Sequence, residues 1–179
     1  MTGDATTFEK ETPMSDDALS LGTITAHGAS HQGRLTREFE HPPAKVWQML
    51  TESPLMAQWL SAGTIEQRPD GKVRIDFVDS GIVIDSQVSA FDAGKLLEYS
   101  WSSGSEPQRP LRWELSPTAG GTRLVLTVGV PAGEDAAKAC AGFEGHLEML
   151  AAALEGVPIK FPFETYMKAR AGYKAMLQA

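Results

Sequence analysis

Apolar and polar residues alternate along most of the chain between Thr64 and Pro131. Short groups of Gly, Pro, Asp and Ser interrupt the alternation and divide it into runs. The clearest runs cover residues 73–77, 82–88, 97–101, 111–115 and 124–130. Strict alternation bounded by turn residues is typical of strands with one buried face, so we expect an antiparallel meander joined by short hairpins. Residues 102–110 contain too many Ser, Gly and Pro residues for a strand and predict a longer loop.

An opening hairpin and two short helices are predicted before this region. The hairpin would pair residues 19–26 with residues 32–40 across the polar turn 27–31. Pro42-Pro43 then ends the extended run, and apolar residues at helical spacing predict a first helix over 44–50. Ser53 as N-cap, followed by proline, predicts a second short helix that ends near residue 60.

After Gly133 the apolar spacing changes to the helical period of about 3.6 residues. One narrow stripe is formed by Ala136, Cys140, Phe143, Leu147, Leu150 and Leu154. The stripe predicts a long helix that Gly156 and Pro158 end, with Glu144, Glu148 and Glu155 on the side away from the sheet. A last amphipathic helix is expected over 163–177. Whether it docks on its own domain or on a partner, such as a second copy in a homodimer, stays open.

Together these elements predict an α+β domain of two layers over residues 19–156. We expect a curved antiparallel sheet of about six to seven strands, wrapped around the long C-terminal helix, with two short helices after the first strand. Residues 157–179 would form a C-terminal helical extension. A strongly curved sheet that grips one helix often cannot bring the two layers into full contact. We therefore expect an apolar cavity between them.

Four stretches of the sequence resemble a known family. They are Pro43-Ala44-Lys45-Val46-Trp47 with its continuation to Leu60, Leu97-Glu98-Tyr99-Ser100-Trp101, Gly120-Gly121-Thr122-Arg123-Leu124, and residues 141–150. With the order of elements, they are similar to the activator-of-Hsp90-ATPase-homologue-like branch of the START/Bet v 1-like helix-grip superfamily. The resemblance covers roughly residues 32–156 and implies a helix-grip fold. Its motifs mark fold rather than chemistry, so they transfer little about function.

Charge and hydropathy narrow the function classes. The formal net charge is −7, and −4 of it lies in residues 1–18, where five acidic residues accompany one lysine. Such a segment cannot bury enough apolar surface to order itself, so we expect residues 1–18 to be a disordered acidic leader. A net acidic chain argues against a nucleic-acid partner. No apolar run suits a signal peptide or a membrane span, so we expect a cytoplasmic protein without membrane insertion. Met14 offers a second start for translation, and the sequence leaves that choice open.

The cysteine and motif content excludes several chemistries. Cys140 is the only cysteine, which excludes an internal disulfide framework and a zinc site built from several thiolates. Its place on the apolar stripe predicts an inert thiol. The chain has no G-x-S-x-G elbow, no phosphate-binding glycine loop and no H-E-x-x-H pair. We therefore expect no metal site and no cofactor, and assign no catalytic residue.

Aromatic and polar residues on the inner faces are the candidates for a ligand site. Trp101 and Trp113 can offer flat walls with N–H groups, or can simply pack in the core. His146 lies at the edge of the helix stripe and can bond a ligand, act as an acid or base, or meet a backbone or water partner. Ser86 is polar within an apolar row and needs either a backbone or a ligand partner. The predicted cavity lining is Trp59, Phe77, Ser86, Tyr99, Trp101, Trp113, Phe143, His146, Leu147 and Leu150.

Three functional hypotheses follow. The leading one is a protein that binds a small hydrophobic or amphipathic ligand between the sheet and the long helix. The second, implied by the resemblance, is an enzyme like the polyketide cyclases and aromatases, which would need His146, Tyr99 and Ser86 around one pocket. The third, also implied by the resemblance, is a partner that stimulates a chaperone ATPase through an exposed apolar surface, which could involve residues 163–177. Because catalytic motifs are absent, we favour binding over catalysis.

Overall fold

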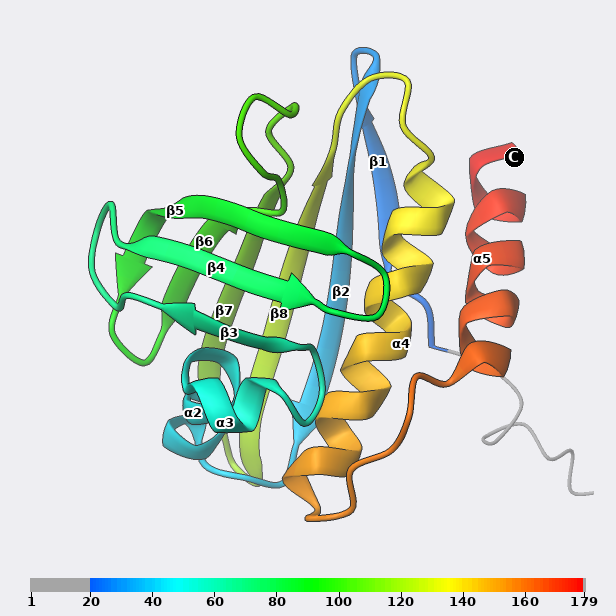
Figure 1. Cartoon of the computed structure of the whole chain (residues 1–179). Helices are drawn as coiled ribbons and strands as arrows, with labels where there is room; N and C mark the ends of the chain where they lie inside the picture. Colours follow the sequence, from blue (N-terminus) through cyan, green and yellow to red (C-terminus); the bar gives the residue numbers. More distant parts are fainter. Residues whose placement is uncertain (1–19, 179) are drawn as a thin grey trace, which may run out of the picture.

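Eight antiparallel strands form the sheet, in the order β1-β2-β8-β7-β6-β5-β4-β3 (Figure 1). The computed structural model describes residues 20–178, so the predicted leader at residues 1–18 lies outside the described residues. The strands are β1 (Thr23–His27), β2 (Ser30–Phe39), β3 (Ala62–Ile65), β4 (Lys72–Phe77), β5 (Ile82–Asp92), β6 (Leu96–Ser100), β7 (Pro110–Thr118) and β8 (Gly121–Val130). The sequence predicted about six to seven strands; β3, with only four residues, is too short to show alternation.

The helices lie close to their predicted positions, except that the second short helix ends at Met56 rather than near residue 60. They are α2 (Pro43–Thr51), α3 (Ser53–Met56), α4 (Ala136–Leu154) and α5 (Phe163–Gln178). Ser53 is the first residue of α3 rather than its N-cap; Glu52 holds that place and makes no side-chain cap. Gly156, with a φ of 78°, follows the end of α4 as predicted. The α+β helix-grip architecture predicted from the sequence is confirmed: the sheet curves round α4, and α5 forms an outer layer beside α4 (Figure 1).

Strand β5 divides the sheet into two parts. Its first half, Ile82 to Gln87, pairs with β4, whereas Val88 to Asp92 pair with β6. The register shifts between Val88 and Ala90. Because the first half of β5 leaves β6, strands β3, β4 and β5 run across the direction of β7 and β8 (Figure 1). This split opens a space on each side of the sheet, and both grooves described below adjoin it.

The predicted stripe of α4 packs against the sheet as expected. Cys140, Leu147 and Leu150 have no exposed surface. Gly33 of β2 lets α4 approach the sheet closely, because a Cβ there would lie 2.4 Å from the sulfur of Cys140. Burial raises the pKa of that thiol to about 12, which agrees with an inert packing role.

The opposite side of α4 is covered by α5, which the sequence left open. Glu144 is only 2% exposed there, although the sequence placed it on the side away from the sheet among polar residues. The Tyr173 hydroxyl donates to Glu144 Oε1 at 2.5 Å, and Arg37 of β2 pairs with Glu144 Oε2. The backbone N–H of Gly22 donates to Tyr173 Oη at 2.9 Å. This cluster ties α5, α4, β2 and the segment before β1 together.

Candidate functional site

The site is built on the N-terminal half of α4. Asp135 caps this helix by accepting a hydrogen bond from the backbone N–H of Lys138 at 3.0 Å. Residues at spacings of three and four then share one face of the helix. Along this face the side chains change from Lys138 through the small Ala139 and Gly142 to His146. The face turns towards the split in the sheet rather than into the fully packed core.

A groove of about 670 Å³ lies between this face of α4 and the sheet. We call it the mouth groove. Its walls come from the start of β5, the loop between β6 and β7, α4, and one residue of α5. The lining residues are Ile82, Val83, Ile84, Trp101, Glu106, Arg109, Glu134, Asp135, Lys138, Ala139, Gly142, Phe143, His146 and Tyr166.

Aromatic rings connect the mouth groove to the core. Phe143 contacts Trp101, with ring centroids 5.3 Å apart, and Trp113, with centroids 6.5 Å apart. Trp113 meets Trp59 edge to face at 5.5 Å. On the other side, Phe77 lies 5.8 Å from the Trp101 ring. All four contacts are edge to face, a favourable geometry for aromatic pairs that holds the rings in fixed orientations.

His146 lies among aromatic rings at this groove. Its ring lies 5.3 Å from Phe161, 6.2 Å from Phe77 and 6.3 Å from Phe143, measured between centroids. Its Nδ1 lies 2.9 Å from the carbonyl oxygen of Trp59. Burial lowers the pKa of His146 below its ordinary value, although the Trp59 carbonyl acts in the opposite direction. The ring is therefore neutral at pH 7.

A charged bridge spans one end of the mouth groove. Arg109, from the β6–β7 loop, makes a two-bond contact with Glu134 before α4, with N–O distances of 2.7 and 2.9 Å. The same guanidinium lies 3.6 Å from Glu106 and 3.3 Å from the carbonyl oxygen of Trp101. The carboxylate of Glu134 raises the pKa of Arg109, so this guanidinium stays charged. The bridge fixes the loop relative to α4.

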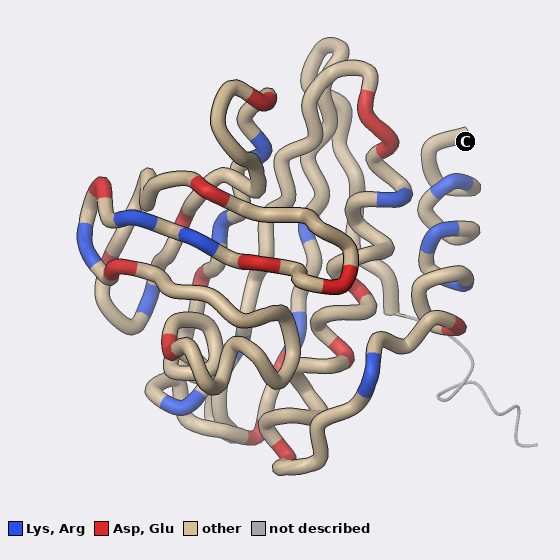
Figure 2. Tube along the Cα trace, in the orientation of Figure 1, with Lys and Arg blue, Asp and Glu red and all other residues tan. Residues whose placement is uncertain are grey.

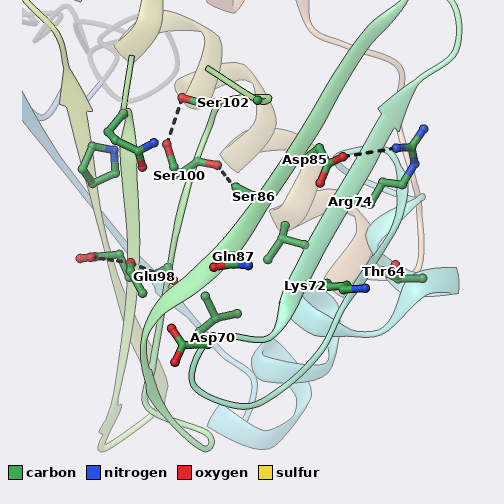
Figure 3. A pocket seen from close by; sticks show the side chains of 16 residues that line it. Thr64, Asp70, Lys72, Arg74, Asp85, Ser86, Gln87, Glu98, Ser100 and Ser102 are labelled. Atoms are coloured by element: carbon green, nitrogen blue, oxygen red, sulfur yellow. Dashed lines mark hydrogen bonds and ion pairs between the residues drawn. The ribbon is translucent and has the colours of Figure 1, made fainter. Parts of the chain in front are cut away.

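A second, polar groove of about 920 Å³ lies on the other side of the split (Figure 3). We call it the outer groove. Ser86, Ser100 and Ser102 form a row there, with Ser86 Oγ donating to the carbonyl oxygen of Ser100 at 2.7 Å. Ser100 Oγ lies 2.9 Å from Ser102 Oγ. The row joins the separated strands where the backbone ladder between β5 and β6 is interrupted.

The structure distributes the predicted lining residues among three places. Trp101, Phe143 and His146 line the mouth groove, and Phe77 contacts the rings of Trp101 and His146. Ser86 lines the outer groove. The remaining five pack in the core, with at most 1% of their surface exposed: Trp59, Tyr99, Trp113, Leu147 and Leu150. Burial also raises the pKa of Tyr99, so its phenol remains protonated.

Sequence reasoning missed several groove residues. Tyr166 reaches the groove only because α5 docks on its own domain. Arg109 belongs to a loop without any periodic pattern. Gly142 could have been noticed in the sequence. A glycine inside a long helix lowers helix stability by about 1 kcal/mol relative to alanine, so its presence there suggests a structural or functional role. Apart from its chain neighbours and the backbone of its own helix, a Cβ at Gly142 would meet no atom within 4 Å, so the space above it is open.

The mouth groove can hold an apolar ring or chain and can satisfy a polar group at His146. Within residues 20–178, no three or more His, Cys, Asp or Glu side chains lie together in an arrangement that could hold a metal ion. Over the same residues, no helix is both long and apolar enough to cross a membrane.

Solved structures with this fold are numerous. The chain is similar to the conserved protein of unknown function EF2215 from Enterococcus faecalis, with a TM-score of 0.69, 19% identity and coverage of 87% of this chain and 91% of that one. CalU16 from Micromonospora echinospora gives a TM-score of 0.69 at 17% identity, covering 88% and 96% of the two chains. DynU16, described as a putative protein in the dynemicin biosynthetic locus, gives a TM-score of 0.63 at 26% identity. That match covers 71% of this chain and 48% of the other, so this chain corresponds to about half of DynU16.

The family comparison agrees with the fold. A search of curated proteins gave no significant match. The family model described as "Activator of Hsp90 ATPase homolog 1-like protein" matches residues 40–155, which include every element from α2 to α4. This chain belongs to the Activator of Hsp90 ATPase homolog 1-like protein family.

Proposed function

We propose that the protein binds a small apolar or amphipathic molecule in the mouth groove. The groove itself carries the proposal: about 670 Å³ of space with Trp101, Phe143 and Tyr166 on its walls. Small-molecule sites typically have volumes of roughly 300–1,000 Å³ and combine apolar walls with a few polar groups. The single histidine among aromatic rings fits that description.

The proposed ligand lies at the mouth of the sheet–helix interface rather than deep inside it. Trp59, Tyr99 and Trp113 occupy the interior and are each 1% exposed. Their rings and the leucines of α4 pack where the sequence predicted a cavity. The split in β5 instead provides an opening at the edge of this core. A ligand there needs no rearrangement of the core.

The outer groove is larger but supports a ligand less well. Its serine hydroxyls already bond one another and the backbone, and Ser102 Oγ also donates to the carbonyl oxygen of Pro107 at 2.5 Å. Arg74 and Asp85 face each other across 3.7 Å and are both more than half exposed (Figure 3). Water satisfies such surface groups well, so little free energy is gained by covering them.

Titration with N-phenylnaphthylamine, a neutral apolar dye whose emission rises in apolar surroundings, tests the proposal. The wild-type protein should bind the dye at a single site. Gly142→Leu should weaken binding by about tenfold or more, because its side chain enters the open space above α4. Gly142→Ala is the matched control and should bind nearly as well as wild type. Absence of binding, or equal binding by wild type and Gly142→Leu, would contradict the proposal.

The cyclase-like alternative is not supported by the positions of the three polar residues that it requires. It required His146, Tyr99 and Ser86 around one pocket. His146 lines the mouth groove, Ser86 lines the outer groove, and Tyr99 is buried in the core. The three residues therefore do not line one common groove.

One observation favours a second candidate, a partner that stimulates a chaperone ATPase. Phe163 and Met167 lie one turn apart on α5 and are 67% and 54% exposed. Figure 2 shows basic positions farther along the same helix. If this surface contacts a chaperone, Phe163→Ser with Met167→Ser should remove any stimulation that the wild-type protein produces in an ATPase assay. Absence of stimulation by the wild type would dismiss this candidate.

A further inference from the structure

We infer that the mouth groove selects a flat aromatic molecule carrying a hydroxyl or another hydrogen-bond donor, and that His146 reads this donor. The inference rests on the proposed function and specifies its ligand class. It depends on three features. The first is the protonation state of the His146 imidazole, and the second is the accessibility of its Nε2. The third is the helix surface at Gly142, one turn away, which carries no side chain.

The backbone fixes which nitrogen of His146 carries the proton. The carbonyl oxygen of Trp59, 2.9 Å from Nδ1, can only accept a hydrogen bond. Nδ1 must therefore donate. Because burial lowers the pKa of this ring, it carries one proton at pH 7, and that proton is on Nδ1. The other nitrogen, Nε2, is left as an acceptor without a proton.

This acceptor remains available within residues 20–178. No described group bonds to Nε2, and the only fully buried side-chain nitrogen or oxygen without a partner there is Nε of Arg170. Nε2 therefore keeps some accessible surface, and His146 lines the mouth groove. Phe77, Phe143 and Phe161 surround the ring and hold it in place. A ligand donor would meet an acceptor that is already oriented.

The helix surface next to His146 suits a planar ring. Gly142 lies four residues before His146, which is about 6 Å along the helix axis and on the same face. The space above it is open, and its neighbour Ala139 is also small. Trp101 and Phe143, with rings inclined by 72°, present aromatic surface beside this bare stretch. A ring seated over Gly142 can place a substituent donor at Nε2 and meet these walls in offset or edge-to-face contact.

The chemistry of the acceptor predicts selectivity. A phenol can donate to Nε2, whereas an ether or ketone of the same size offers only lone pairs. Such a ligand would cover Nε2 without offering it a donor, and an unpaired buried acceptor is costly. The donor-bearing ligand should therefore bind about tenfold more tightly than its matched analogue.

The experiment compares naphthol with methoxynaphthalene on the full chain, using calorimetry or the intrinsic fluorescence of the ligands. Wild type should prefer naphthol by about tenfold. His146→Phe should lose that preference and still bind methoxynaphthalene, which shows that the groove persists. His27→Phe, an exposed position on β1 outside the groove lining, is the control and should keep the preference.

A second measurement needs no substitution. In ¹⁵N spectra of the wild type, naphthol should shift the Nε2 resonance of His146, and methoxynaphthalene should leave it nearly unchanged. Equal affinity of the two ligands for wild type, or a preference that survives His146→Phe, would overturn this inference alone. Failure of both ligands and of the dye to bind would overturn the proposed function and this inference with it.

Discussion

Removing a single oxygen atom tests how α5 is held to the domain. In Tyr173→Phe the ring keeps its place in a site with no exposed surface, but the hydroxyl is lost. That hydroxyl donates to the buried carboxylate of Glu144 at 2.5 Å and accepts from the N–H of Gly22 at 2.9 Å. Both bonds link α5 to parts of the chain that are distant in sequence.

The magnitude follows from the kinds of bond that are lost. A hydrogen bond to a charged group contributes about 1.5–3 kcal/mol, and a neutral one about 0.5–1.5 kcal/mol. Part of the second loss is recovered, because the Gly22 N–H also lies 3.4 Å from Glu144 Oε1. We therefore expect Tyr173→Phe to lower the free energy of unfolding by about 2–3 kcal/mol.

Urea unfolding followed by tryptophan fluorescence measures this change, and the unfolding temperature should fall by roughly 2–4 °C for each kcal/mol. Tyr166→Phe is the matched control on the same helix, since the Tyr166 hydroxyl bonds no other residue within 20–178. The control should stay within about 0.5 kcal/mol of wild type. If Tyr173→Phe also stayed within that limit, the buried cluster would not be what secures α5.

Three further outcomes are expected. Gly145→Ala should destabilise the fold by about 1–3 kcal/mol, because the new Cβ would lie 2.6 Å from the ring of Phe161, and this outweighs the better helix propensity of alanine. An unchanged or raised midpoint of thermal unfolding would contradict this prediction. Burial lowers the pKa of His146 in the folded protein below its ordinary value of 6.5. As the pH drops below about 6.5, the unfolded chain therefore binds a proton at this residue more readily than the folded protein does, and the free energy of unfolding should fall. His146→Phe should reduce this slope, which for one proton is at most about 1.4 kcal/mol per pH unit, in urea titrations at several pH values. With its pKa raised to about 12, the Cys140 thiol should react with a thiol reagent at pH 8 only after denaturant is added; rapid labelling of the native protein would contradict this.

Most of the sheet and its central helix could be predicted from local spacing. The interval from Val73 to Phe77 lies in β4, and the stripe from Ala136 to Leu154 has the bounds of α4. Such patterns are reliable because side chains on a strand alternate between two faces and those on a helix return to one face every three or four residues. Strand β3 has only four residues, which are too few for the alternation of apolar and polar residues to be recognised.

The candidate site could be predicted only in part. Trp101, Phe143 and His146 were predicted as lining residues because they lie on or beside apolar rows, and they line the mouth groove. Ser86 belongs to the same kind of row, yet it lies in the outer groove because β5 leaves β6 before Val88. The separation of β5 from β6 depends on the packing of the whole sheet. The apolar row that contains Ser86 shows no local pattern from which it could be predicted.

The sequence by itself determined the type and order of the elements, the helix-grip fold and the aromatic content of the inner faces. These follow from local periodicity, which is a property of neighbouring residues. Only the tertiary structure decided that Glu144 is buried beneath Tyr173, that Gly142 faces open space, and that Tyr166 completes a groove. Each of those outcomes requires α5 or the β6–β7 loop to meet α4 across a long stretch of chain, and a helical pattern cannot reveal which distant element will cover its second face.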